Sequence, residues 1–219
     1  KEAKWRELEK EGFHSIHLDD TLFDPFDAAG INRMLEPEGY IYGAGYGMYL
    51  KPTFFLAELL SSAWEEGHRV YTVGEELVRD LFSAPAMLLG STIVLRNDPL
   101  KALLWDKYSV LKPGEDSTLA RAFLAQGLRP QQPLDKDFAS AMERMTASYR
   151  SMLLRHELAE SAESALGWKD ILIALDHRGA EHFVRAVQDL IADTSDSGPI
   201  KYATDHDDTP SLLLYAGLL

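Results

Sequence analysis

The chain has 219 residues, with 22 basic and 35 acidic side chains, and therefore a formal net charge of −13 at pH 7. This charge argues against binding to nucleic acid or to an anionic membrane, because both need clustered Lys and Arg. The 46% of hydrophobic residues is typical of a folded globular protein, and no apolar run approaches the roughly 18 to 20 residues of a membrane span. Cysteine is absent, which excludes disulfides and thiolate metal sites, and we expect a cytoplasmic protein.

The first half of the chain mixes strand and helix signals. Residues 1–8 are charged and lack the apolar stretch of a signal peptide, and because no initiator Met precedes them we expect a cut or processed end. Residues 40–49 are rich in Gly and Tyr and predict a hairpin or an irregular loop. Their glycine spacing does not match a dinucleotide-binding fingerprint. The other predicted elements are a helix over 54–66, a strand over 69–73, a helix over 75–82 and a strand over 91–95.

The second half of the chain is dominated by helix signals. Capping residues and apolar periodicity predict helices over 100–110, 135–166 and 177–192, whereas the apolar run 171–175 fits either a strand or a buried helix. We therefore expect a mainly α fold, or α+β with a small β element near residues 40–96. The Pro- and Gln-containing stretch at 127–133 predicts a division into a mixed α/β part over 1–130 and a helical part over 131–219, with a single domain as the alternative.

The helix over 135–166 carries one continuous stripe whose chemistry changes along its length. With about 100° per residue, an apolar stripe faces the core, and the same arc is then continued by His156, Glu160 and Glu163. The apolar part of the stripe is formed by Phe138, Met142, Met145, Tyr149 and Met152. We expect Phe138, Met145, Tyr149 and Met152 to be buried in a single helix.

The polar end of this stripe predicts a metal site. His156 and Glu160 are one turn apart, so an imidazole and a carboxylate can bind one ion, and Glu163 can complete or support the site. Glu157 would be the general base that deprotonates a metal-bound water. The sequence His-Glu-Leu-Ala-Glu at 156–160 resembles the His-Glu-x-x-His motif of zinc proteases, with Glu160 in place of the second His. This resemblance implies a similar mechanism only.

A further ligand could come from the next helix. His177 lies in its first turn and is the first choice for a distant ligand, with Asp176 as the second. The apolar arc of this helix is formed by Ala180, Val184, Val187 and Ile191, and we expect Glu181 and His182, which lie off this arc, at the surface.

The leading functional hypothesis is a metal-dependent hydrolase, with zinc as the ion and a small molecule or a peptide as the substrate. The competing hypothesis is a non-catalytic interaction or structural protein without metal, in which the acidic surface and residues 40–49 contact a protein partner, and the polar residues of 156–163 are solvated. A di-metal helical protein ranks third, because its Glu-x-x-His spacing is missing. Neither nucleic acid nor a membrane is expected as a partner.

Overall fold

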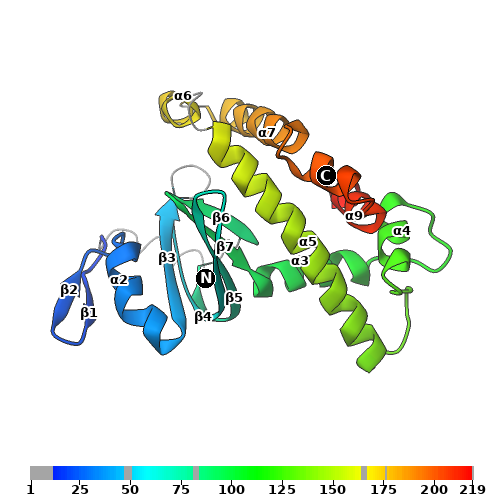
Figure 1. Ribbon diagram of the computed structural model, residues 1–219, viewed down its shortest axis with the longest axis horizontal. Coiled ribbons are helices and arrows are strands. Elements are labelled where there is room, and N and C mark those ends of the chain that lie inside the picture. Colours follow the sequence, from blue (N-terminus) through cyan, green and yellow to red (C-terminus); the bar gives the residue numbers. More distant parts are fainter. Residues whose placement is uncertain (1–11, 47–50, 81–83, 164–166, 176, 219) are drawn as a thin grey trace. The chain divides into compact units, whose positions relative to one another are not determined.

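The structure is a computed structural model that describes residues 12–46, 51–80, 84–163, 167–175 and 177–218 (Figure 1). It divides into two compact units, residues 1–59 with 76–82 and residues 60–75 with 83–219. Helices account for 51% of the structure and strands for 25%, so the fold is α+β. The prediction of a mainly α protein is therefore wrong. The predicted division at residue 130 stays a prediction.

The strands form a five-stranded mixed sheet and a separate two-stranded sheet. The larger sheet has the order β3-β4-β5-β7-β6, in which β5 and β7 are parallel, whereas β3–β4 and β6–β7 are antiparallel. The predicted strand over 69–73 is confirmed within β5, and the predicted strand over 91–95 is confirmed from residue 92 onward as part of β7. The strands are β1 (Ile16–Leu18), β2 (Thr21–Phe23), β3 (Tyr40–Tyr46), β4 (Pro52–Glu65), β5 (His68–Arg79), β6 (Ala86–Leu89) and β7 (Thr92–Arg96).

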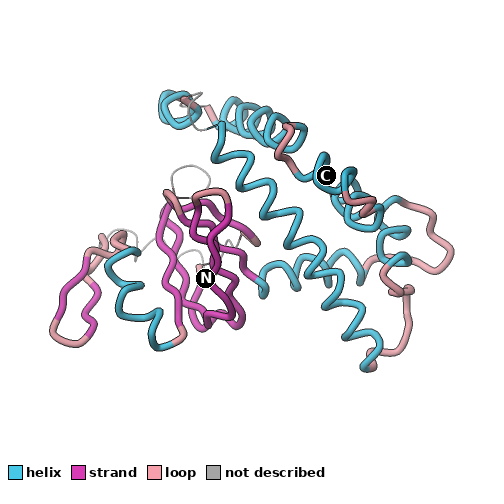
Figure 2. The backbone as a smooth tube through the Cα atoms, in the orientation of Figure 1, coloured by secondary structure: helices cyan, strands magenta, loops and turns pink. Residues whose placement is uncertain are grey.

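The correction to the fold class comes mainly from β4 and β5. Residues 54–66, predicted as a helix, belong to β4 and the turn after it, and Figure 2 shows β4 and β5 as strands. The predicted helix over 75–82 is also wrong, because residues 75–79 belong to β5; residues 81 and 82 lie outside the described part. The two-residue turn explains the error, since Glu66 and Gly67 have φ of 49° and 85°, as in a type I′ hairpin. Strand pairing across this turn overrides the helix propensity of the Leu-, Ala- and Glu-rich segment.

Residues 40–46 of the glycine-rich segment form β3, and residues 47–50 lie outside the described part. Gly43 is paired with Phe55 of β4, and a Cβ atom at Gly43 would lie 1.9 Å from the Phe55 ring. Glycine is therefore required there by close packing. The free edge of β3 is covered by the helix α2 (Ala28–Leu35), because the Asn32 side chain exchanges hydrogen bonds of 2.7 and 2.8 Å with the Tyr42 backbone.

The second unit contains the helices that position the site. The predicted helix over 100–110 is found as α3, and residues 171–175, for which the sequence fits either a strand or a helix, lie mostly in the helix α6. The helices are α3 (Asn97–Ser109), α4 (Thr118–Ala125), α5 (Lys136–Ala162), α6 (Trp168–Ala174), α7 (Arg178–Thr194), α8 (Pro199–Asp205) and α9 (Thr209–Leu218), and a short 3-10 helix, η2 (Glu36–Glu38), lies in the first unit. Among the described residues, no helix combines the length and the apolar character needed to cross a membrane.

Helix α5 agrees with the sequence prediction over most of its length. The Asp135 side chain caps its first turn by accepting hydrogen bonds from the backbone N–H groups of residues 137 and 138. The helix ends at Ala162, earlier than the predicted 166, and residues 164–166 lie outside the described part. The predicted burial of the apolar stripe is confirmed: the exposed fractions are 7% for Phe138, 0% for Met145, 7% for Tyr149 and 0% for Met152.

Replacing Gly43 with Ala tests the close packing between β3 and β4. We expect Gly43→Ala to lower the free energy of unfolding by about 1–3 kcal/mol, because the added methyl group must displace the Phe55 ring. Urea unfolding of the two proteins measures the difference. In a Phe55→Leu background the same Gly43→Ala change should cost clearly less, and equal costs in both backgrounds would contradict this packing.

Candidate functional site

The polar end of α5 lies between the strands β6 and β7 on one side and α7 on the other. On the sheet side, Leu158 packs with Val70, Ile93 and Leu95 in a buried cluster. The other side of this end of α5 contacts α7, which runs alongside it in Figure 1. Buried packing on one side and a polar contact on the other therefore hold the site residues of α5 in place.

Two polar contacts attach this end of α5 to the hairpin formed by β4 and β5. Arg155 donates a hydrogen bond of 2.8 Å to the Glu66 carboxylate, and His68 Nε2 lies 2.6 Å from the Ser161 hydroxyl. Both contacts flank the segment 156–160. They fix the rotation of the helix, which decides which side chains face α7.

Helix α7 turns a polar face toward α5. Among the side chains of α7 whose burial is described, Gln188, Ala192 and Asp193 are buried. Glu181, expected at the surface, is only 13% exposed and pairs with Arg185 at 3.0 Å. These residues lie at helical spacing on one side of α7. Polar side chains therefore lie on the buried side of α7.

The central contact joins His156 to Asp193. The Nδ1–H of His156 donates a hydrogen bond of 2.7 Å to Asp193 Oδ1, and the two side chains are only 18% and 6% exposed. The other ring nitrogen, Nε2, lies 4.0 Å from Asp189 Oδ1. A carboxylate that holds Nδ1 in this way orients the ring and leaves Nε2 as the nitrogen for a metal ion.

Two glutamates of α5 complete a group of possible metal ligands. One ligand atom each from His156, Glu157 and Glu160 lies within 4.8 Å of the other two. Zinc ligands at about 2.0–2.2 Å from the ion are roughly 3.3–3.5 Å apart, so small side-chain rotations would close this group around an ion. The Gln188 amide donates a hydrogen bond to Glu160 and restrains its carboxylate.

The site holds more negative than positive charge, and its pKa values show the consequence. Burial by itself lowers the pKa of His156, but the hydrogen bond that His156 donates to Asp193 and the charges of Glu157, Asp193 and Asp189 outweigh it and raise the pKa to about 9. Burial and the charge of Glu160 raise the pKa of Glu157 to about 7. Burial also raises the pKa values of Glu160 and Asp189. A divalent cation would neutralise this excess.

Tyr215 of α9 is a second partner of Asp193. The Tyr215 side chain is 5% exposed and hydrogen-bonded to Asp193; burial, followed by this hydrogen bond, raises the pKa of its hydroxyl. Asp193 therefore contacts both an imidazole and a phenol. These partners hold the buried carboxylate in position toward His156.

The two other predicted ligands lie elsewhere. Glu163 follows the last turn of α5 and is close enough to Glu160 to raise the pKa of Glu160, but it is not part of the three-residue group. Its Oε2 atom is buried without a hydrogen-bond partner. His177 is exposed and caps α7, where its Nδ1 accepts a hydrogen bond of 3.1 Å from the Gly179 N–H. Asp176 lies outside the described residues.

Sequence reasoning missed the residues that α7 contributes. Asp193 lies one residue beyond the predicted helix over 177–192, and the apolar pattern of that helix does not distinguish Gln188 or Asp189. The available signal was the helical spacing of polar residues along one side of α7, at positions 181, 185, 188 and 189. That spacing is typical of a solvated face, so it does not by itself reveal the contact with α5.

Fold and site together define an α+β protein with a partly buried His/carboxylate group between two helices. Its sequence matches two family models, those of the N-terminal domain (residues 1–96) and the C-terminal domain (residues 101–219) of a family of unknown function, DUF6866. The chain belongs to this family. No curated protein and no solved structure is significantly similar to it.

The raised pKa values predict that the metal-free protein loses stability as the pH rises. The pKa of His156 is about 9 in the folded state and 6.5 in the unfolded state. Its contribution to the free energy of unfolding is therefore complete below pH 6.5 and is lost as the pH rises through 9. The raised pKa of Glu157 likewise stabilises the folded state at low pH, and this stabilisation is lost between pH 4.5 and 7. We expect the free energy of unfolding to fall by on the order of 2–3 kcal/mol between pH 6.5 and 9.

Chemical unfolding at several pH values in the presence of a chelator measures this loss. The matched control is His156→Asn, which removes the titrating group and should flatten the dependence between pH 6.5 and 9. A wild-type protein whose stability is constant or rises over this interval would contradict the assignment.

Proposed function

We propose that the protein is a metal-dependent hydrolase of the zinc type, with its ion held between α5 and α7. The ligands would be His156 Nε2, Glu160 and Asp189, with Glu163 as a group that moves in to complete the site. The observation that carries the proposal is the buried hydrogen bond between Asp193 and His156 Nδ1, because it orients the other ring nitrogen toward carboxylates. Asp189 takes the place of His177, whose ring is used to cap a helix.

Glu157 is the general base of the proposed reaction. A divalent ion held by these ligands would supply a water molecule of lowered pKa, and Glu157 would accept the proton of that water. A general base works best when its pKa lies near the working pH, and the pKa of Glu157 is about 7. The leaving group then receives the proton from Glu157, which restores the base.

The remaining parts of the proposal concern substrate and location. A small molecule or a peptide is the proposed substrate, and the net charge of −13 supports the absence of nucleic acid and of anionic membranes among the partners. A cytoplasmic location is supported by the lack of cysteine. A protein without bound metal would instead support the alternative, a non-catalytic interaction protein.

Metal content tests the ligand set. We expect the wild-type chain to bind one Zn²⁺ and His156→Ala to lose it, because the only nitrogen ligand is removed. Asp193→Asn should weaken binding about 10- to 100-fold by releasing the imidazole. Metal analysis after equilibrium dialysis against zinc measures both effects.

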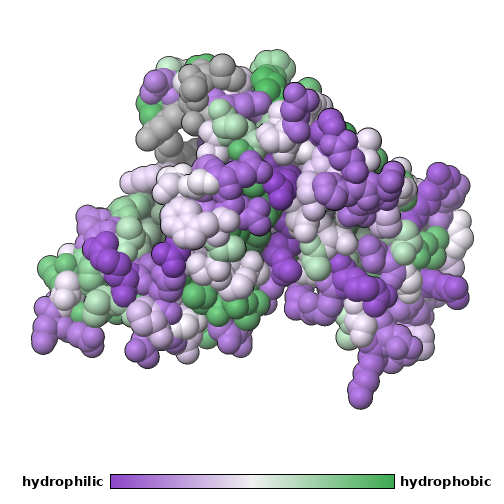
Figure 3. Space-filling model, viewed as in Figure 1, coloured by the Kyte–Doolittle hydropathy of each residue, from purple (hydrophilic) through white to green (hydrophobic). Residues whose placement is uncertain are grey.

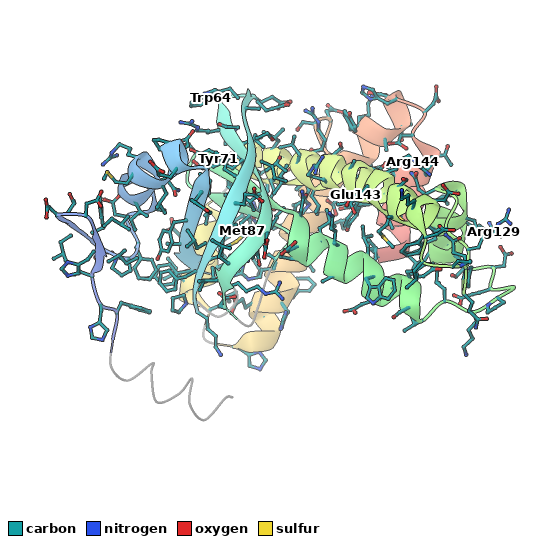
Figure 4. All side chains as sticks on the ribbon, turned by 90° about the horizontal axis from the view of Figure 1, so that it is seen from below. Trp64, Tyr71, Met87, Arg129, Glu143 and Arg144 are labelled. Atoms are coloured by element: carbon teal, nitrogen blue, oxygen red, sulfur yellow. The ribbon has the colours of Figure 1, made fainter. Side chains whose placement is uncertain are left out.

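The control for these variants lies on the same helix. Glu143 is 63% exposed, pairs with Lys101 and is labelled in Figure 4, so Glu143→Gln should leave metal binding unchanged. A wild-type chain that binds no divalent ion, or a His156→Ala variant that binds as much as wild type, would overturn the metal site.

Activity tests the role of Glu157. We expect Glu157→Gln to retain the metal and to lower hydrolysis by about 10²- to 10⁴-fold, because the amide cannot accept the proton. The assay compares the zinc-loaded proteins on panels of activated esters, phosphate esters and short peptides. Unchanged activity of Glu157→Gln in any reaction that His156→Ala abolishes would contradict Glu157 as the base.

A further inference from the structure

The first unit contains a cluster of five aromatic rings. Phe54 is at its centre, with ring centroids 5.5 Å from Phe13, 5.2 Å from Phe26 and 6.2 Å from Tyr42. Phe26 also contacts Phe13 edge-on at 5.3 Å and stacks on Tyr46 at 4.9 Å with an interplanar angle of 10°. The rings therefore form one connected surface, named here the aromatic surface: Phe13, Phe26, Tyr42, Tyr46 and Phe54.

The register of β3 and β4 explains why these rings share one face. Ala44 pairs with Phe54, so Tyr42 and Tyr46, two residues to either side of Ala44, lie on the same face as Phe54. The residues that alternate with them are buried on the opposite face, where Ile41 and Phe55 are 0% and 1% exposed. The same two strands thus present a core face and an aromatic face.

The aromatic surface is open to solvent at its rim. Tyr46 is 61% exposed and Phe13 is 57% exposed, and Leu22 of β2 in the same unit is 58% exposed. Figure 3 shows hydrophobic side chains over β1 and β2 beside hydrophilic ones. Contacts between the rings already order them, so binding would cost little further side-chain entropy.

The surroundings of the aromatic surface are acidic. The described residues of the first unit include nine Asp and Glu but three Lys and Arg. Asp80 is bound to the backbone of the strand that carries the central ring: its Oδ2 accepts hydrogen bonds from the Thr53 hydroxyl and the Phe54 N–H, whereas its buried Oδ1 has no hydrogen-bond partner. Together with burial, the charge of Asp24 raises the pKa of Tyr42 to about 12. Carboxylates therefore lie close to the rings.

We propose that the aromatic surface binds a Lys- or Arg-rich segment of a partner protein. A cation above an aromatic ring is attracted by the negative face of the ring, and a guanidinium can also stack on it. The acidic residues add long-range attraction for the same segment. A second copy of this chain fits less well, because the two copies would bring the same excess of negative charge together. The proposal goes beyond the proposed hydrolase and uses none of its site residues.

Binding of a synthetic peptide of alternating Arg and Gly to the full chain tests the proposal. We expect saturable binding by isothermal titration calorimetry, and no binding of the peptide with Glu in place of Arg. Each exposed ring raises the affinity for the Arg peptide roughly two- to fivefold, so Phe13→Ala and Tyr46→Ala should each weaken binding by that factor. The double variant should weaken binding by about tenfold. The single variant Tyr46→Leu should behave like Tyr46→Ala, because it keeps apolar area but lacks the aromatic face.

The matched control is Trp64→Ala, which removes an exposed aromatic side chain outside the aromatic surface, 71% exposed and labelled in Figure 4. It should bind the Arg peptide like wild type, and thermal unfolding verifies that all variants are folded. Equal affinities of wild type and the double variant would show non-specific charge attraction and overturn the proposal. Self-association that depends on Phe13 and Tyr46, without peptide binding, would overturn it in favour of a second copy.

Discussion

The contact between His156 and Asp193 is the interaction on which the arrangement of the second unit's helices depends. Charged side chains are buried at low cost only when they are paired, and a 2.7 Å hydrogen bond joins these two across α5 and α7. Once α5 turns His156 toward α7, the adjoining helix must supply a polar face. That requirement explains why Gln188 and Asp193 are buried while Phe183 and Leu190, on the other side of α7, are 70% and 61% exposed.

The same pairing leaves the site with an unbalanced charge. One imidazole and Arg185 face Glu157, Glu160, Asp189 and Asp193, and the raised pKa values of the first three carboxylates follow from burial together with mutual repulsion. Protons relieve this repulsion at low pH, and a divalent cation would relieve it at neutral pH. A bound metal ion would therefore compete with protons for the same residues.

The two units carry different kinds of chemistry. The second unit combines ionisable groups in a partly buried site, whereas the first presents ordered rings among carboxylates. In both cases one face of an element is used for packing and the opposite face for polar or aromatic side chains, as on β3 and on α5. The proposed hydrolytic site and the proposed recognition surface can therefore be tested by separate substitutions.

Local pattern alone determined α5 and the α5 part of the site. The Asp135 cap, the 3.6-residue spacing of the apolar stripe and the adjacency of His156 and Glu160 are all properties of one helix, and each was predicted from sequence. The strand β4 was mistaken for a helix because its identity depends on pairing with β3 and β5, which lie elsewhere in the chain. Asp193 and Asp189 come to His156 only through the packing of α7 against α5. Contacts between distant segments leave little trace in local periodicity, and the tertiary structure alone decided them.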